Sequence, residues 1–171
     1  MGIKIALAGN PNCGKTTMFN ALTGANQYVG NWPGVTVEKK EGELRNKEGV
    51  VVVDLPGIYS LSPYSAEEVV ARDFLMKDKP DVVIDVVDAT NLQRNLYLTV
   101  QLMEIGVPTV VALNMIDEVK RQGKRIDVPL LSKRMGLPVV AISAASGQGC
   151  EELIERAMER TRKKIALPCP E

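Results

Sequence analysis

Hydrophobic and polar positions along this 171-residue chain alternate between two patterns. Short, almost wholly apolar runs are typical of strands buried on both faces of a parallel sheet. They occur at 3–8, 50–54, 82–88, 108–113 and 139–142. Between them, apolar residues recur with helical periodicity, which predicts helices at 15–23, 66–77, 92–105, 128–135 and 150–164. The alternation predicts an α/β fold with helices on both faces of a mostly parallel sheet, which would bind ligands at the carboxyl ends of its strands.

Two of the predicted helices carry apolar stripes that we expect to face the core. We interpret these positions as core packing and not as cofactor ligands. They are Leu96, Val100 and Met103 in one helix, and Ile154, Met158, Thr161 and Ile165 in the other.

Two segments interrupt the alternation. Glycines and prolines punctuate 24–44 and predict a long connection before a short charged strand near 37–45. A second irregular segment, 55–68, contains Ser65 followed by Glu68, the spacing of a capping box at a helix start. Long internal loops are usually functional or mobile, so both segments are candidates for function.

Composition and charge narrow the class of protein. With 45% hydrophobic and 25% charged residues the chain resembles ordinary globular proteins, and its length favours one domain spanning 1–171. Lys+Arg and Asp+Glu both count 21, so no basic excess indicates nucleic acid as a partner. The chain has no histidine, which removes histidine-based acid–base chemistry and the commonest zinc ligand. The cysteines, Cys13, Cys150 and Cys169, lack metal-ligand spacing, and we expect them to be reduced thiols.

Membrane and targeting signals are missing from the pattern. No apolar run approaches the roughly 18 residues that span a bilayer, and Met1 leads into a strand-like segment instead of a signal peptide. We therefore expect this piece to be soluble. The Pro-rich tail 166–171 directly follows a predicted helix, so we expect the chain to be cut from a longer polypeptide.

The strongest chemical signal is 9-GNPNCGKT-16, which lies between the strand predicted at 3–8 and the helix predicted at 15–23. This is the phosphate-binding Walker A pattern in its expected strand–loop–helix context. Gly9 and Gly14 would let backbone N–H groups close around phosphates at a helix N-terminus. Lys15 would supply charge to the β- and γ-phosphates, and the Thr16 hydroxyl would bind magnesium. The residues assigned to phosphate binding are Gly9, Asn10, Pro11, Asn12, Cys13, Gly14, Lys15, Thr16 and Thr17.

A second motif, 50-VVVDLPG-57, places Asp54 at the end of an apolar strand and Gly57 in the turn that follows. Alone, this DxxG spacing more often marks a strand ending in a turn. Behind a Walker A sequence, Asp54 becomes the expected magnesium-side carboxylate, acting directly or through a water. The Gly57 amide could then donate to the γ-phosphate and sense its loss.

Base recognition is predicted at 114-NMID-117 and 143-SAA-145, each of which follows an apolar strand. A carboxylate at Asp117 can accept hydrogen bonds from guanine N1 and N2, whereas adenine would present an acceptor to it. Alone, NxxD is usually a helix cap. We expect the Ala144 N–H to face guanine O6. The assigned base-binding residues are Asn114, Met115, Asp117, Ser143, Ala144 and Ala145.

These four segments in this order resemble the small GTP-binding (G) protein family, P-loop GTPases of the TRAFAC class, over nearly the whole chain. The resemblance implies GTP and GDP as ligands and Mg²⁺ as cofactor. It also implies a P-loop NTPase fold of the Ras-like kind, with a six-stranded sheet whose one antiparallel strand lies near 37–45. Switch I would span 24–38, with Thr36 closing over magnesium, and switch II would span 54–72.

The switch sequences 30-GNWPGVTVE-38 and 54-DLPGIYSLSPYSAEEVVAR-72 closely resemble the amino-terminal G domain of the FeoB family of prokaryotic ferrous iron transporters. Nucleotide chemistry does not dictate Tyr59, Ser60, Leu61, Pro63 or Tyr64, which makes the likeness specific. It implies a helical spacer domain and a membrane-embedded iron(II) channel on the same polypeptide, and a place at the cytoplasmic face of the cell membrane. A homo-oligomer is an open expectation. Without histidine or a close cysteine cluster, we expect iron specificity to reside in other segments.

The catalytic group is the least determined feature. Ile58 stands where Ras-like proteins place a water-orienting glutamine, so hydrolysis would be slow or would use a switch backbone or Thr36. Switch I has no arginine. Asn12 resembles the asparagine of potassium-activated GTPases, and with the carbonyls of Gly30 and Trp32 it could hold K⁺ beside the phosphates. Alternatively, Asn12 satisfies a turn.

Catalytic roles are thus assigned to Lys15, Thr36, Gly57 and Asn12. We expect the surrounding loop to leave Trp32 partly exposed, where it could contact K⁺, dock a partner or anchor the loop. Three functions stay open: a potassium-stimulated GTPase coupled to iron(II) passage, a GTP-dependent signalling switch with little turnover, and a free-standing GTPase of tRNA modification or ribosome assembly.

Overall fold

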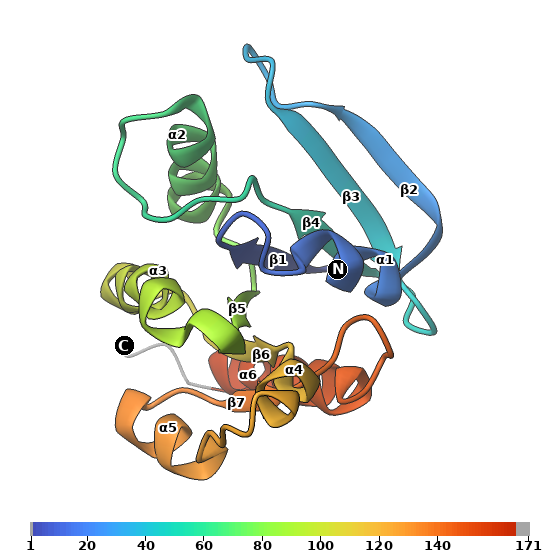
Figure 1. Ribbon diagram of the computed structural model, residues 1–171. Coiled ribbons are helices and arrows are strands. Elements are labelled where there is room, and N and C mark those ends of the chain that lie inside the picture. The colour runs from blue at the N-terminus through green and yellow to red at the C-terminus, as the bar shows by residue number, and fades with distance from the viewer. Residues whose placement is uncertain (1, 167–171) are drawn as a thin grey trace.

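A mixed sheet organises the chain (Figure 1). The computed structural model describes residues 2–166, apart from the side chains of 25, 26 and 162–166. Within that part the sheet has seven strands in the order β2-β3-β4-β1-β5-β6-β7. The strands are β1 (Ile3–Gly9), β2 (Thr23–Asn31), β3 (Glu38–Leu44), β4 (Val50–Asp54), β5 (Val82–Asp88), β6 (Thr109–Asn114) and β7 (Val139–Ala141). The predicted α/β class and all the predicted apolar strands are confirmed.

Helices lie at all five predicted places. The helices are α1 (Lys15–Leu22), α2 (Ala66–Asp73), α3 (Leu92–Ile105), α4 (Ile116–Arg121), α5 (Val128–Met135) and α6 (Cys150–Ala166), of which α4 is an additional helix that the pattern did not predict. A π-helical turn, Phe74–Asp78, extends α2, and a 3₁₀ turn, Ala89–Asn91, precedes α3. The Ser65 hydroxyl accepts a hydrogen bond from the Glu68 N–H, so the predicted cap of α2 is confirmed. No helix in the described part of the chain is long and apolar enough to cross a membrane.

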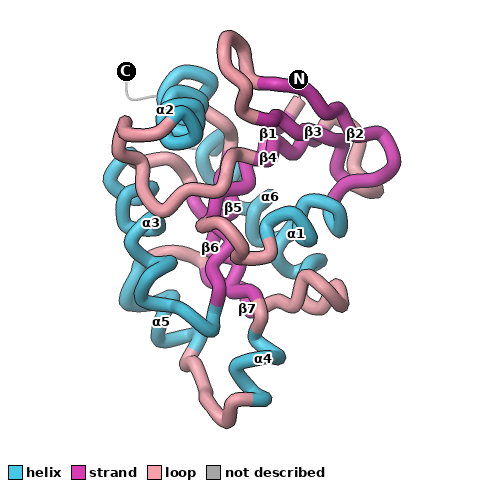
Figure 2. The backbone as a smooth tube through the Cα atoms, turned by 45° about the horizontal axis from the view of Figure 1, so that its top comes forward, coloured by secondary structure: helices cyan, strands magenta, loops and turns pink. Residues whose placement is uncertain are grey.

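The core has two sides because successive residues of β1 point to opposite faces of the sheet. Ile5 and Leu7 pack with α1 and α6, whereas Ala6 and Ala8 pack with α2 and α3. The views in Figures 1 and 2 agree with this division. A third cluster packs α4 and α5 against the far strands β5 to β7. The sheet is therefore covered by helices on both faces, which leaves its strand ends for function.

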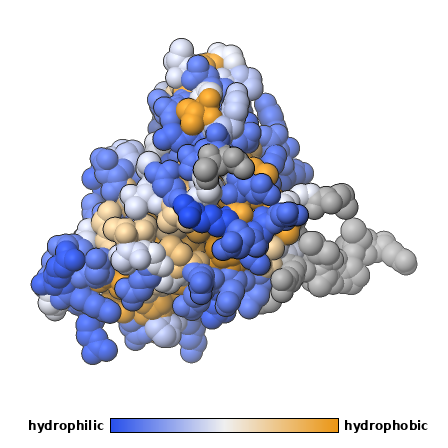
Figure 3. Space-filling view, turned by 90° about the vertical axis from the view of Figure 1, so that its right-hand side faces the viewer, coloured by the Kyte–Doolittle hydropathy of each residue, from blue (hydrophilic) through white to orange (hydrophobic). Residues whose placement is uncertain are grey.

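The expected six-stranded sheet is wrong by one strand, and the first part of the expected switch I loop is that strand. β2 pairs antiparallel with β3, with Val29 opposite Lys40 and Asn31 opposite Glu38. The two strands form a long hairpin at one edge of the sheet (Figure 2). The side chains of Tyr28 and Val29 are 57% and 59% exposed, so backbone pairing, not core burial, holds β2 in place. Figure 3 shows mostly hydrophilic side chains on the face that corresponds to the right-hand side of Figure 1.

The predicted buried face of α3 is also wrong. Val100 and Met103 are exposed, and Leu96 is only half-buried. The buried side chains are instead Asn95, Leu98, Thr99 and Leu102. In α6, Thr161 is buried as predicted and Ile154 and Met158 are half-buried, while the side chain of Ile165 lies outside the described residues.

Two polar residues explain the misplaced face of α3. Asp85 of β5 is fully buried, and the Thr99 hydroxyl donates a hydrogen bond to its Oδ2 atom. Burial raises the pKa of the Asp85 carboxyl from its ordinary value of 3.8 to about 7, although the bond from Thr99 opposes the shift. The buried face of α3 includes Thr99, which donates a hydrogen bond to the buried Asp85 carboxyl group. Because this face is partly polar, it does not form an apolar stripe in the sequence.

Asp85 makes the stability of the fold depend on pH. Because its pKa is raised in the folded chain, folding favours the protonated form, and this contribution to stability is lost as pH rises toward the folded pKa. Replacing Asp85 with asparagine removes the dependence. We expect the free energy of unfolding of Asp85→Asn, relative to the unchanged protein, to rise by about 3 kcal/mol between about pH 5 and about pH 8. Urea unfolding of both proteins at each pH measures this, and a difference that stays constant with pH would contradict it.

Candidate functional site

Apart from those of switch I, the predicted site residues come together at one edge of the sheet, where the parallel strands end. Gly9 ends β1, Asp54 ends β4 and Asn114 ends β6. Residues 10–14 connect β1 to α1 as a compact loop, in which the Cys13 N–H donates to the Asn10 carbonyl. A cavity of about 440 Å³ lies against this loop, and its lining residues are Asn10, Pro11, Asn12, Gly14, Lys15, Thr16 and Gly57. The loop and the DxxG turn therefore share one cavity, as the motifs predicted.

Lys15 and Asp54 form a buried ion pair beside this cavity. The Lys15 Nζ atom lies 2.5 Å from Asp54 Oδ1, and both residues are less than a tenth exposed. Burial raises the pKa of the Asp54 carboxyl, and the Lys15 ammonium group opposes that shift. Each charge is thus held where phosphate or metal could take over as its partner.

Magnesium fits the donors that the structure gathers here. The Thr16 hydroxyl lies on the first turn of α1 at the cavity, and Asp54 is next to Lys15. These are hard oxygen donors, and Mg²⁺ typically takes one or two such protein ligands together with phosphate oxygens and water. No group of three or more His, Cys, Asp or Glu residues in the described part of the chain could hold a metal by itself. A metal at this cavity would therefore rely on a phosphate ligand.

Close packing against neighbouring segments favours glycine at two site positions. Gly14 has φ +89°, and a Cβ atom there would collide with the Asn114 Nδ2 atom. A Cβ atom on Gly57 would lie 3.2 Å from the Pro11 Cα atom. The Asn114 side chain therefore occupies space beside Gly14 that we expected to be left for phosphates.

Asn114 ties the two ends of the site together. Its Nδ2 atom donates to the Cys13 carbonyl at 3.0 Å, and its Oδ1 atom accepts from the Ala144 N–H at 3.0 Å. In this structure Asn114 is the partner of the Ala144 N–H, and the expected contact of that N–H with guanine O6 stays a prediction. Asn114 is itself buried, so its first role is to hold the phosphate loop against the loop after β7.

The other base-side residues lie around Asn114. Met115 has φ +65° and precedes α4, a helix that the pattern did not predict. Asp117 lies in the first turn of α4 with its carboxylate 44% exposed, 3.5 Å from Arg121 Nη2. Ser143 is buried and its N–H donates to the Gln148 carbonyl, whereas Ala145 is exposed. The Asp117 carboxylate is thus accessible to a base.

Switch II is anchored by residues that sequence reasoning missed. Ile58 is buried in the core, and its N–H donates to the Gly9 carbonyl at 3.0 Å. Its side chain packs in the core and does not line the phosphate-loop cavity. The Leu61 N–H donates to Gln101 Oε1 at 2.7 Å, and the Arg94 guanidinium lies 4.4 Å from the centre of the Tyr59 ring. Both partners come from α3, and no local motif connects them to switch II.

Switch I lies elsewhere. Gly30 pairs with Lys39 in the hairpin, and the Trp32 N–H donates to the Val37 carbonyl. Thr36 is exposed, and none of Gly30, Trp32 and Thr36 is among the described residues that line the phosphate-loop cavity. This structure therefore gathers Thr16, Asp54 and Asn12 at the cavity without the switch I ligands predicted for magnesium and potassium.

Trp32 is buried, which corrects the expectation of a partly exposed side chain. It is 6% exposed and packs edge-on against Phe74 with 5.5 Å between ring centres. The Lys39 ammonium group lies 4.7 Å from the centre of the indole ring. Trp32 therefore anchors switch I against the end of α2 in this structure.

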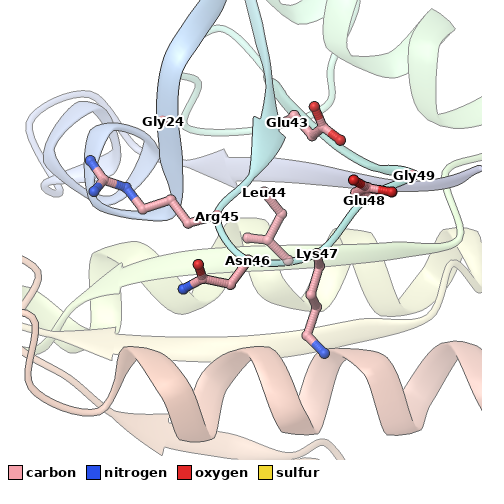
Figure 4. A pocket seen from close by; sticks show the side chains of 8 residues that line it. All are labelled: Gly24, Glu43, Leu44, Arg45, Asn46, Lys47, Glu48 and Gly49. Carbon is pink, nitrogen blue, oxygen red and sulfur yellow. The ribbon is translucent and has the colours of Figure 1, made fainter.

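Two remaining features add no chemistry to the site. Burial raises the pKa of the Cys13 thiol to about 11, so this thiol stays protonated and only its backbone serves the loop. A cavity of about 730 Å³ lies at the β3–β4 turn and is lined by Gly24 and residues 43–49 (Figure 4). Acidic and basic side chains mix there, and none of the predicted site residues is among them.

A phosphate loop, an aspartate after the neighbouring strand and an NxxD segment on this α/β sheet define a P-loop G domain. The family described as "Ferrous iron transport protein B" matches residues 3–157, and the chain belongs to this family. The chain is 50% identical over 170 residues to an Fe(2+) transport protein A/Fe(2+) transporter FeoB fusion protein of Porphyromonas gingivalis, covering 97% of this chain. It is 53% identical over 156 residues to Fe(2+) transporter FeoB of Salmonella typhimurium, covering 88% of this chain. In both cases it spans 20% of the relative's length.

Solved structures agree with this assignment. A GDP-bound mutant of S. thermophilus NFeoB is 53% identical and superposes with a TM-score of 0.92 over 99% of this chain and 66% of that one. The G domain of the T. maritima FeoB iron transporter is 48% identical, with a TM-score of 0.86 over 94% of this chain and 99% of that one. The predicted resemblance to the FeoB G domain is confirmed.

The two hydrogen bonds of Asn114 make a direct prediction. Asn114→Ala would leave the buried Cys13 carbonyl and the buried Ala144 N–H without partners. We expect the free energy of unfolding to fall by about 2 to 3 kcal/mol, as measured by urea unfolding. Asn20→Ala is the matched control, because Asn20 is exposed and the one hydrogen bond described for its side chain, accepted from Gln27 Nε2, is long at 3.3 Å. We expect that control to change stability by less than about 0.5 kcal/mol, and equal losses in both variants would contradict the role given to Asn114.

Proposed function

We propose that this chain binds GTP and GDP with Mg²⁺ and slowly hydrolyses GTP to GDP and phosphate, as the G domain of a ferrous iron transporter. The Lys15–Asp54 pair beside the phosphate-loop cavity is the observation that carries the proposal. The proposed setting is the cytoplasmic face of the cell membrane, with a helical spacer and an iron(II) channel on the same polypeptide. Hydrolysis there would drive or regulate iron(II) uptake. The relatives' far greater length supports this wider arrangement.

The phosphate end of the site supports binding of a nucleoside triphosphate. Backbone N–H groups of residues 14–16 at the start of α1 favour anionic phosphates, and Lys15 adds a full positive charge. Thr16 and Asp54 would hold Mg²⁺, which neutralises phosphate charge when bound. Lys15 would then exchange its Asp54 partner for phosphate oxygens, and the Gly57 N–H would donate to the γ-phosphate.

The base end of the site supports guanine over adenine. The exposed Asp117 carboxylate can accept from guanine N1 and N2, and adenine offers no such pair of donors. Asn114 fixes the position of this end relative to the phosphate loop through Cys13 and Ala144. The distance between the phosphate and base subsites is thus set by hydrogen bonds before any nucleotide binds.

Catalysis requires a group other than residue 58, because the Ile58 side chain is buried in the core. Asn12 is exposed at the cavity with φ +64°, where its side chain can reach a cation beside the phosphates. A K⁺ ion there, completed by the carbonyls of Gly30 and Trp32, would stabilise the charge that develops on the phosphate oxygens. Thr36 and those carbonyls must first leave the arrangement seen in the β2–β3 hairpin.

The burial of Ile58 also favours a second function, a GTP-dependent signalling switch with little turnover. In that case nucleotide occupancy would gate the transporter and hydrolysis would only reset it. A free-standing GTPase of tRNA modification or ribosome assembly is the less favoured reading, because the family is one of transport proteins and the chain has no net positive charge.

Steady-state GTP hydrolysis in K⁺ and in Na⁺, at matched ionic strength, tests the proposed enzyme. We expect K⁺ to accelerate hydrolysis, and Asn12→Ala to lose at least about tenfold of that acceleration because a ligand to the stabilising cation is removed. Asn46→Ala is the matched control, since Asn46 is also exposed with positive φ but lies at the β3–β4 turn. It should keep the full effect of K⁺.

Three outcomes separate the claims. Equal, very slow rates in both salts would contradict the potassium step and favour the signalling switch. Acceleration that survives in Asn12→Ala would contradict the role of this residue. Absence of both GTP binding and hydrolysis would contradict the proposed function itself.

A further inference from the structure

Asn10, the first residue after β1, has a side chain whose hydrogen-bonding capacity is unused. The residue is 4% exposed, and both Oδ1 and Nδ2 are buried without a hydrogen-bond partner among the described residues. Asn95 is also 4% exposed, yet its amide accepts from the Asp88 N–H and donates to the Asn91 carbonyl. A buried amide with no partner disfavours the conformation that contains it. The contrast shows that Asn10 is not an ordinary buried asparagine of this fold.

The position of Asn10 suggests which segment could supply its partners. On one side of it, the Gly9 carbonyl accepts from the Ile58 N–H. On the other side, Pro11 packs against Gly57 closely enough that a Cβ atom on Gly57 would lie 3.2 Å from Pro11 Cα. Asn10 is therefore flanked by two contacts with the start of switch II.

The main chain at this start of switch II is fixed at two points, and among the described residues no hydrogen bond holds the main chain of residues 59 and 60 between them. Ile58 is held by Gly9, and the Leu61 N–H is held by Gln101. Residues 59 and 60 lie between these points outside any helix or strand, and Tyr59 is 45% exposed. Their peptide groups can change orientation without unfolding either anchor.

We propose that Asn10 is a positioning residue for the γ-phosphate-bound state, in which its side-chain amide pairs with the main chain of residues 57–60. The inference rests on the proposed function, because it assumes that Gly57 moves to meet a γ-phosphate. A carboxamide carries one acceptor and donors on the same plane, which matches both polar groups of a peptide. The unpaired amide disfavours the arrangement seen in this structure, so pairing after closure would bias the domain toward the GTP-bound arrangement. Asn10 thereby acts through switch II and not on the phosphate.

Binding measurements on variants of the whole 171-residue chain test this role. Titration calorimetry would give affinities for GDP and for a non-hydrolysable GTP analogue, and urea unfolding without nucleotide would give stability. For Asn10→Ala we expect the ratio of analogue affinity to GDP affinity to fall by about fivefold to tenfold relative to the unchanged protein. Stability without nucleotide should stay equal or rise, because an unpaired buried amide is removed. Asn10→Ser, which keeps a donor and an acceptor, should restore part of the preference for the analogue.

Asn95→Ala is the matched control for burial and residue type. This variant loses the two hydrogen bonds that the Asn95 side chain makes with Asp88 and Asn91. Its stability should therefore fall, while its ratio of analogue affinity to GDP affinity stays unchanged. Equal losses of GDP and analogue affinity in Asn10→Ala, with reduced stability, would overturn the proposal and make Asn10 a structural residue only. An unchanged affinity ratio in Asn10→Ala would also overturn it. Failure of the unchanged protein to bind either nucleotide would instead overturn the proposed function.

Discussion

The site depends on the buried ion pair between Lys15 and Asp54. Removing two charges from water is costly, and neither would be tolerated at this depth without the other. The pair joins the phosphate loop to the end of β4, so the fold holds a charge that would serve phosphate within 2.5 Å of one that would serve a metal. A bound nucleotide with Mg²⁺ would supply a new partner to each charge. The electrostatic cost of burying Lys15 and Asp54 would thus also favour binding of a nucleotide with Mg²⁺.

Hydrogen bonds between strand ends turn this pair into a site of defined dimensions. The Ile58 N–H joins switch II to Gly9, and Asn114 joins the phosphate loop to Ala144. The Gly14 position disfavours a side chain, because Asn114 occupies the space that a Cβ atom would need. These contacts cross three loops that are far apart in the chain. They hold the part that would bind phosphates at a fixed distance from the part that would bind the base.

Switch I is the part that this framework does not hold. Trp32 anchors it through Phe74 and Lys39, on the α2 side of the sheet, while Thr36 stays exposed. Closure over the phosphates would require backbone pairs of the β2–β3 hairpin to open. Nucleotide binding would then change the exposed surface of this hairpin.

Local patterns predicted the elements that are themselves local. The Walker A loop, the strands that end at Asp54 and Asn114 and the cap at Ser65 could all be read from adjacent residues. β2 could not, because Tyr28 and Val29 are exposed and the strand is held by pairing with β3. The buried face of α3 was predicted wrongly because it contains a polar residue, Thr99, which donates a hydrogen bond to the buried Asp85 carboxyl group of β5. The acceptor of the Ala144 N–H depends on a contact with Asn114 across 30 positions, which no motif records.

Calorimetric titration of this chain with GDP and with ADP, each with and without Mg²⁺, tests most directly that this edge of the sheet is a guanine-nucleotide site. We expect GDP to bind at least about 100-fold more tightly than ADP, because adenine would leave the Asp117 carboxylate facing an acceptor. We also expect Mg²⁺ to strengthen GDP binding. Equal affinities for GDP and ADP, or no binding of either, would contradict this assignment.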